Sequence, residues 1–119
     1  MKLAWNVLQS CAVSREWCHL AKPAKPAKRL KLLSIVRLFL SDIRAVERGL
    51  SVANRSRPDA IEILPAVAAV KTTGDFQHCP FPRITGGLCR TEGDIREALA
   101  SGCQAVTSTL ARLWELNKA

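Results

Sequence analysis

Two short apolar segments in the last third of the chain each end in small or hydroxylic residues, and each is followed by an amphipathic segment. The first covers residues 81–88 and contains Thr-Gly-Gly-Leu; the second covers residues 102–109 and ends in Thr-Ser-Thr. Between them, Thr91 and Asp94 have the spacing of a capping box, and an apolar stripe with helical spacing follows. The pattern predicts a βαβ unit, in which two parallel strands end at the same edge of a sheet.

The same alternation of strand and helix begins at residue 33. It favours an α/β fold with a parallel sheet and right-handed crossovers. We divide the chain into an N-terminal segment, residues 1–33, with a candidate strand at 7–13 and a candidate helix start at 14–21, and a domain at residues 34–119. In the domain we expect strands at 33–39 and 60–64, helices at 41–53 and 66–71, a loop at 72–80 and, after the βαβ unit, a terminal helix at 110–116.

The charge balance favours an anionic partner. The 119 residues include 18 Lys and Arg against 10 Asp and Glu, a formal net charge of +8, which suits a nucleic acid, a phosphorylated ligand or an acidic surface. A Pro-Ala-Lys repeat concentrates part of this charge, and it could bind an RNA backbone. The alternative is a solvated linker, which is the more usual role of a run of charged residues. The candidate RNA-binding residues are Lys22, Lys25, Lys28, Arg29 and Lys31.

Several classes of protein do not fit the sequence. The longest apolar stretch, residues 30–40, contains Lys31 and Arg37 and is far shorter than the roughly 20 residues that cross a membrane. The five cysteines form no Cys-x-x-Cys pair, so we expect no metal site, and their odd number argues against a complete disulfide framework. We expect a cytoplasmic protein.

Four motifs in order resemble the glycerol-3-phosphate-responsive antiterminator family. They are Arg-Leu-Phe-Leu-Ser-Asp at 37–42, Arg-Pro-Asp-Ala-Ile-Glu-Ile-Leu-Pro at 57–65, Ile-Thr-Gly-Gly-Leu at 84–88, and Ala-Val-Thr-Ser-Thr at 105–109 with Leu-Trp at 113–114. The resemblance implies a TIM-type (β/α) barrel. Because a closed barrel of this type needs roughly 200 residues or more, it also implies that this chain holds only the second half, roughly strands four to eight.

The resemblance implies a regulatory function rather than an enzymatic one. Members of the family sense glycerol 3-phosphate and bind the leader of messenger RNA from glycerol uptake and utilisation genes, where they prevent transcription termination. We therefore expect glycerol 3-phosphate as an effector, a messenger RNA leader as a partner, and no cofactor. One departure is Ala66, where the family usually has glycine after Leu-Pro.

The residue types at the strand ends suit a phosphate ligand. Gly86 and Gly87 would let the backbone approach phosphate oxygens, because no Cβ intervenes and positive φ is accessible. Ser108 and Thr109 could donate hydroxyl and amide hydrogens to the same group, near helix N-termini that favour an anion. A plain strand-to-helix turn is the alternative for the glycine pair.

Two charged residues complete the candidate site. Glu62 could accept hydrogen bonds from glycerol hydroxyls, and Arg37 could balance its charge or bind the ligand anion. A purely structural ion pair between them explains the same residues, because a buried charge needs a partner in any case.

Other functions stay open at the level of sequence. A phosphate-binding barrel enzyme is one alternative, with Glu62 as the candidate acid or base; an inactive remnant is another. A half-barrel leaves unpaired strand edges, which makes a homodimer through these edges possible.

Overall fold

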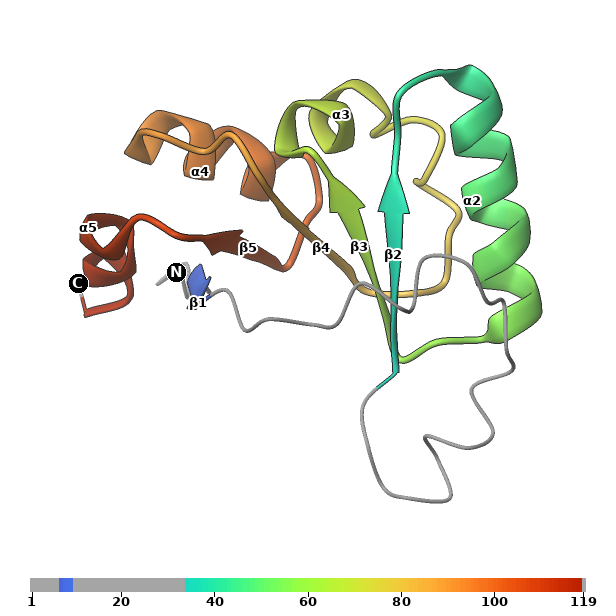
Figure 1. Ribbon diagram of the computed structural model, residues 1–119, viewed down its shortest axis with the longest axis horizontal. Helices are drawn as coiled ribbons and strands as arrows, with labels where there is room; N and C mark the ends of the chain where they lie inside the picture. The colour runs from blue at the N-terminus through green and yellow to red at the C-terminus, as the bar shows by residue number, and fades with distance from the viewer. Residues whose placement is uncertain (1–6, 10–33, 119) are drawn as a thin grey trace.

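The computed structural model describes residues 7–9 and 34–118, and Figure 1 shows strands alternating with helices along this part of the chain. The elements are β1 (Val7–Gln9), β2 (Ile35–Phe39), α2 (Ile43–Ser56), β3 (Ala60–Leu64), α3 (Ala66–Lys71), β4 (Arg83–Gly86), α4 (Glu92–Ala100), β5 (Ala105–Ser108), α5 (Ala111–Trp114) and the 3-10 helix η2 (Glu115–Lys118). The expected strand at 60–64 and helix at 66–71 are confirmed residue for residue.

The strands form one parallel sheet in the order β1-β5-β4-β3-β2. The α/β class with parallel strands is thereby confirmed. The position of the first strand differs from expectation, since strands four to eight of a barrel in sequence would put β1 beside β2. Instead, β1 pairs with β5, with Val7 opposite Val106, so the first and last strands are neighbours. The remainder of the expected N-terminal strand and the expected helix start lie outside the described residues.

Two of the expected strands are shorter than the sequence pattern indicated. The segment at 81–88 forms a strand only at Arg83–Gly86, because Gly87 and Leu88 follow with φ of 81° and 60°, outside the extended region. The segment at 102–109 forms a strand only at Ala105–Ser108, after Gly102 with φ of 99°. The terminal helix is also short and continues as η2.

Helix α2 begins and ends where local chemistry dictates. The Asp42 carboxylate accepts a hydrogen bond from the Ala45 amide at 2.8 Å, and Arg57 ends the helix in the left-handed conformation. Gly49 faces the sheet at close range, because a Cβ there would lie 3.1 Å from a methyl carbon of Leu38. Small residues on this face let the helix pack tightly against β2.

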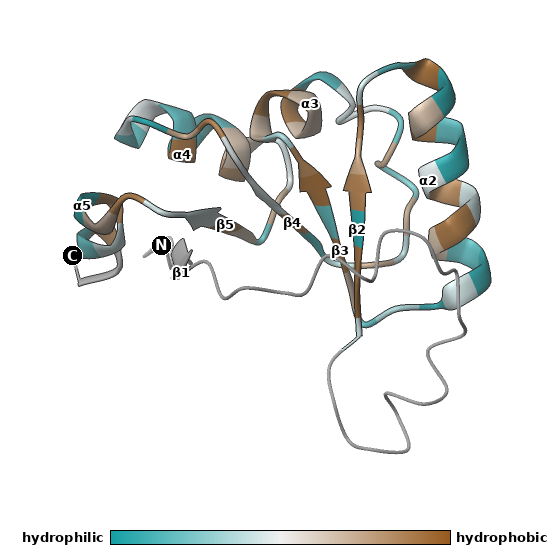
Figure 2. Ribbon diagram, in the orientation of Figure 1, coloured by the Kyte–Doolittle hydropathy of each residue, from teal (hydrophilic) through white to brown (hydrophobic). Residues whose placement is uncertain are grey.

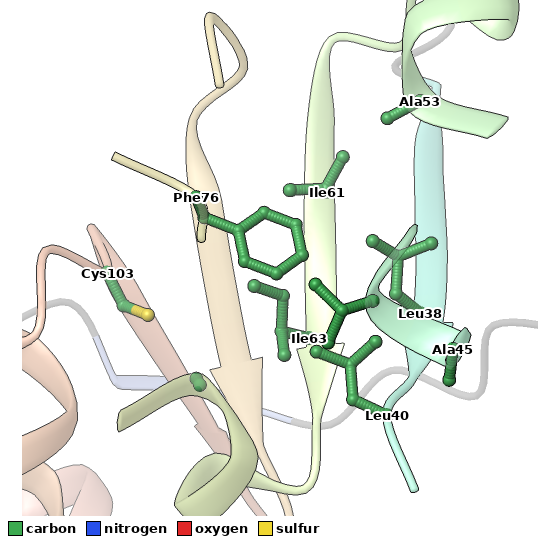
Figure 3. Packing of buried hydrophobic residues seen from close by; sticks show 10 residues of the cluster. Leu38, Leu40, Ala45, Ala53, Ile61, Ile63, Phe76 and Cys103 are labelled. Carbon is green, nitrogen blue, oxygen red and sulfur yellow. The ribbon is translucent and has the colours of Figure 1, made fainter. Parts of the chain in front are cut away.

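Among the described residues, the larger of two hydrophobic clusters lies between the sheet and α2 (Figure 3). Ile61 and Ile63 of β3 are completely buried in it, beside Leu38 of β2. Phe76 is 1% exposed and reaches the cluster from the segment expected to be a plain loop. The second cluster joins α4 and α5 to β5 through Ile95, Ala98, Val106 and Leu113, with Ala66 and Cys89.

The opposite face of the sheet carries the charged residues Arg37 and Glu62. Arg37, Glu62, Ile84 and Ala105 are consecutive register partners across β2 to β5, so they share one face. Figure 2 shows β2 and β3 as mostly hydrophobic strands, each with a hydrophilic band inside it. None of the helices in the described part of the chain is long and apolar enough to span a membrane.

Candidate ligand-binding site

An open cavity of about 220 Å³ lies near the carboxyl ends of β3, β4 and β5. This is the edge at which parallel α/β folds bind their ligands. The volume is below the roughly 300–1,000 Å³ of pockets for drug-sized ligands, so it suits a smaller molecule. The lining residues are Arg37, Glu62, Leu64, Gly87, Leu88, Cys89, Thr107, Ser108 and Thr109.

The structure brings together five of the six candidate ligand residues. Arg37, Glu62, Gly87, Ser108 and Thr109 all line this cavity, although they come from four different segments of the chain. Gly86 does not line it. Their assembly follows from parallel strand register, which places the ends of β3, β4 and β5 side by side (Figure 1).

Arg37 and Glu62 form an ion pair on the floor of the cavity. They are register partners on β2 and β3, and the Arg37 Nε donates to Glu62 Oε2 at 2.7 Å. The Glu62 side chain is 8% exposed and that of Arg37 24%, so the pair is only partly desolvated. The two charges cancel, so the pair adds no net charge to the cavity. This geometry is compatible both with a ligand-binding role and with a purely structural ion pair.

Thr107 belongs to this polar group, although the sequence did not single it out. Its hydroxyl donates to Glu62 Oε1 at 3.2 Å and also lies 3.4 Å from the Thr85 carbonyl oxygen. Both oxygens of the Glu62 carboxylate are therefore hydrogen-bonded. Neighbouring strand residues face opposite sides of a sheet, so the sequence indicated that Thr107 and Ser108 point to different faces. The register that brings Thr107 to Glu62 could not be predicted from the sequence.

Gly86 has a different role from the one expected. It is buried in β4, and a Cβ placed on it would lie 1.8 Å from the Thr107 hydroxyl oxygen. The Thr107 side chain thus fills the space that glycine was expected to leave for a phosphate. Gly86 therefore differs from the expectation: it makes room for Thr107 and does not line the cavity.

Gly87 presents the exposed backbone at this edge. Its φ of 81° favours glycine, whereas the space around it would admit a side chain, since a Cβ would meet Pro65 at an ordinary 3.6 Å. Its carbonyl oxygen accepts from the Ala66 amide at 3.3 Å, which ties the loop to α3. Leu88 follows with φ of 60° and is 68% exposed.

The hydroxyls at the end of β5 retain capacity for a ligand. Ser108 Oγ accepts from the Leu110 amide at 3.1 Å, so its own hydrogen remains to be donated. The Trp114 indole donates to the Ser108 carbonyl oxygen at 2.9 Å and holds α5 against the strand end. Thr109 is exposed beside it.

The N-terminus of α4 does not act as the expected anion site. The capping box is confirmed: Asp94 accepts from the Thr91 amide at 2.9 Å, and its own amide donates to the Thr91 hydroxyl at 3.1 Å. Asp94 also accepts from the Arg90 amide at 2.7 Å, and these amide donors hold the pKa of Asp94 below its ordinary value. The carboxylate therefore already occupies this helix end.

Cys89 completes the lining as a neutral thiol. Burial raises its pKa above the ordinary value, and the negative charge of Asp94 raises it further.

Among residues 7–9 and 34–118, no group of three or more His, Cys, Asp or Glu side chains could hold a metal ion. The five basic candidates for RNA binding, residues 22, 25, 28, 29 and 31, lie outside the described residues.

Comparison with known proteins identifies relatives of this chain. The family model of the glycerol-3-phosphate responsive antiterminator matches residues 20–114. The uncharacterized protein YgcP of Escherichia coli (strain K12) is 32% identical over 98 residues, which are 82% of this chain and 51% of that protein.

Two crystal structures share the fold. A glycerol uptake operon antiterminator regulatory protein from Listeria monocytogenes is 37% identical with a TM-score of 0.68, over 75% of this chain and 48% of that one. A glycerol uptake operon antiterminator-related protein from Thermotoga maritima is 30% identical with a TM-score of 0.65, over 75% and 50%. The chain thus spans about half the length of these relatives. It belongs to the glycerol-3-phosphate responsive antiterminator family.

Proposed function

We propose that this chain binds glycerol 3-phosphate in the cavity at the carboxyl ends of β3 to β5 and serves in antitermination controlled by this ligand. The observation that carries the proposal is the convergence of Arg37, Glu62, Gly87, Ser108 and Thr109 on one small cavity in a member of this family. We expect it to act in the cytoplasm as a regulator of glycerol uptake and utilisation genes.

The two ends of the cavity suit the two ends of the ligand. Gly87 and Thr109 supply exposed backbone and hydroxyl groups, and the buried Ser108 hydroxyl keeps its hydrogen for donation, which suits phosphate oxygens. Glu62 and Arg37 form another part of the lining, where a carboxylate can accept from glycerol hydroxyls and a guanidinium can donate to them. In this arrangement the phosphate contacts supply affinity, and the polyol contacts supply selectivity.

Calorimetric titration with glycerol 3-phosphate tests the ligand. Glycerol and inorganic phosphate are the control ligands, and Ser108→Ala removes one donor from the cavity. We expect saturable binding by the parent chain and an affinity about tenfold or more lower in Ser108→Ala, as is usual for a hydrogen bond to a charged group. Ser56→Ala is the matched control, because Ser56 is a buried serine whose hydroxyl donates to the Val52 carbonyl oxygen in α2.

Equal affinity in the parent chain and Ser108→Ala would contradict the placement of the phosphate. Absence of binding by a folded chain would contradict the function itself.

The RNA partner is proposed from family membership and the net charge of +8. The basic residues Lys22, Lys25 and Lys28, with Arg29 and Lys31, are the proposed contacts with the phosphate backbone. Fluorescence anisotropy with a labelled leader transcript of a glycerol-uptake operon tests this. We expect affinity that falls with rising salt and changes when glycerol 3-phosphate is added, whereas an affinity indifferent to the ligand would contradict the regulatory part of the proposal.

A second copy of the chain is a further proposed partner. The chain matches about half of its relatives, and β2 ends the sheet within the described residues. An unpaired strand edge readily pairs with another chain. Light scattering at several concentrations tests this, with a mass of two chains expected; a mass of one chain, about 13.1 kDa, would contradict it.

A further inference from the structure

Thr107 makes a contact that skips a strand. Its hydroxyl on β5 donates to Glu62 on β3 at 3.2 Å, although β4 lies between these two strands. Neighbouring strands in a sheet are about 4.8 Å apart, so β3 and β5 are separated by roughly twice that distance. A threonine and a glutamate side chain can meet over β4 only where β4 presents no side chain to that face.

Gly86 provides that gap. It is the register partner of Thr107 on β4, and a Cβ there would lie 1.8 Å from the Thr107 hydroxyl oxygen and 3.1 Å from its Cβ. The hydroxyl therefore lies directly over the glycine. This contact explains why a glycine at position 86 lies opposite a threonine at position 107, independently of any ligand.

The result is a carboxylate fixed from both sides. Arg37 Nε holds Glu62 Oε2 at 2.7 Å and Thr107 holds Oε1. A carboxylate has about four lone-pair sites, so acceptor capacity remains on the cavity side. Fixing the plane of the carboxylate fixes where a ligand hydroxyl must lie to donate to it.

We infer that Thr107 is a positioning residue that sets the selectivity of the cavity for a ligand with free hydroxyls over a phosphate ester that lacks them. The inference rests on the proposed function, since it assigns Glu62 to the polyol end of glycerol 3-phosphate. A ligand hydroxyl can donate to the remaining acceptor sites of the fixed Glu62 carboxylate, and a phosphate ester without hydroxyls forgoes this charge-assisted hydrogen bond. Thr107 lines the cavity itself, and its hydroxyl acts on the ligand through the Glu62 carboxylate that it holds.

The test compares two phosphate esters with the same number of carbons. Glycerol 3-phosphate and n-propyl phosphate carry the same charged group, and only the first has the two free hydroxyls. Calorimetry gives the ratio of their affinities for the parent chain, for Thr107→Val, which removes the hydroxyl at nearly constant shape, and for Thr107→Ser, which keeps it. Thr107→Ala removes the same hydroxyl by truncation and serves where the valine variant does not fold.

The matched control is Thr72→Val. The Thr72 hydroxyl donates to the Ala68 carbonyl oxygen at 2.7 Å, and Thr72 is buried at the end of α3, where it does not line the cavity. Thr72→Val removes a buried threonine hydroxyl away from the cavity, so it should lower the stability of the chain without changing the ratio of the two affinities.

We expect Thr107→Val to lower the preference for glycerol 3-phosphate about tenfold, mainly through that ligand, with the affinity for n-propyl phosphate nearly unchanged. Thr107→Ser should keep the preference. An unchanged ratio in a folded Thr107→Val or Thr107→Ala chain overturns the inference and leaves the proposed function standing. Absence of binding of either ester to the parent chain overturns both.

Discussion

Replacement of Gly86 by alanine should destabilise the chain through Thr107. The added Cβ would lie 1.8 Å from the Thr107 hydroxyl oxygen, whereas ordinary contacts begin at 3.4 Å, so the threonine side chain must leave its position. That removes its hydrogen bond to the Glu62 carboxylate, about 1–2 kcal/mol at this length, and adds about 1–3 kcal/mol of crowding in the strand. We expect the free energy of unfolding to fall by about 2–5 kcal/mol, a large share of the 5–15 kcal/mol typical of a domain.

A double-mutant cycle in urea, followed by circular dichroism, measures the coupling between the two positions. In a Thr107→Ala chain the hydroxyl is absent, and the nearest atom to the new Cβ is the carbonyl oxygen of residue 107 at 2.8 Å, so some crowding remains. We expect Gly86→Ala to cost about 1–2 kcal/mol less in that background. Gly74→Ala is the control, because a Cβ there meets nothing within 4 Å and should change stability by no more than about 0.5 kcal/mol. Equal costs of Gly86→Ala with and without the Thr107 hydroxyl would refute the argument.

Three further perturbations test the charges and thiols of the site. Glu62→Gln keeps the side-chain shape but deprives Arg37 of its carboxylate, and we expect a urea titration to show a loss of about 1–3 kcal/mol, less than for a fully buried pair; no loss would contradict the pairing. The lowered pKa of Asp94 means that its stabilising contribution is present above about pH 4 and is lost as the pH falls through the folded-state pKa. Asp94→Asn should therefore flatten the decline in urea midpoint below pH 4, whereas an identical decline would contradict this. Burial raises the pKa of Cys89 and of Cys103, so iodoacetamide at pH 8 should label both more slowly in the folded chain than in urea, as read by peptide mass spectrometry. Glycerol 3-phosphate should slow Cys89 further and leave Cys103 unchanged, and equal protection of the two would contradict the position of the ligand.

Local patterns in the sequence were sufficient for the elements that local chemistry determines. A short, mostly apolar run predicted β3 as a buried strand, and the Thr91 and Asp94 spacing predicted the cap that starts α4. The strand ends were misjudged where positive φ interrupts an apolar run, as at Gly87 and Leu88. An apolar leucine gives no sequence signal of a left-handed backbone.

The parts that could not be predicted depend on contacts between distant segments. Gly86 was expected to approach a ligand because glycine permits that, but whether its space is empty depends on β5, whose register with β4 brings Thr107 over it. The pairing of β1 with β5 joins residues about one hundred positions apart, and nothing in a three-residue strand specifies its neighbour. Phe76 likewise looked like part of a loop, because its burial depends on how that loop returns to the sheet.

An NMR titration of the isotopically labelled chain with glycerol 3-phosphate is the sharpest test that this cavity binds the ligand. We expect saturating shifts of the backbone amides of residues 87–89 and 107–109 with a single midpoint, and little change along Ile43–Ser56 of α2. Absence of shifts at the ends of β4 and β5, or shifts centred on α2, would contradict it.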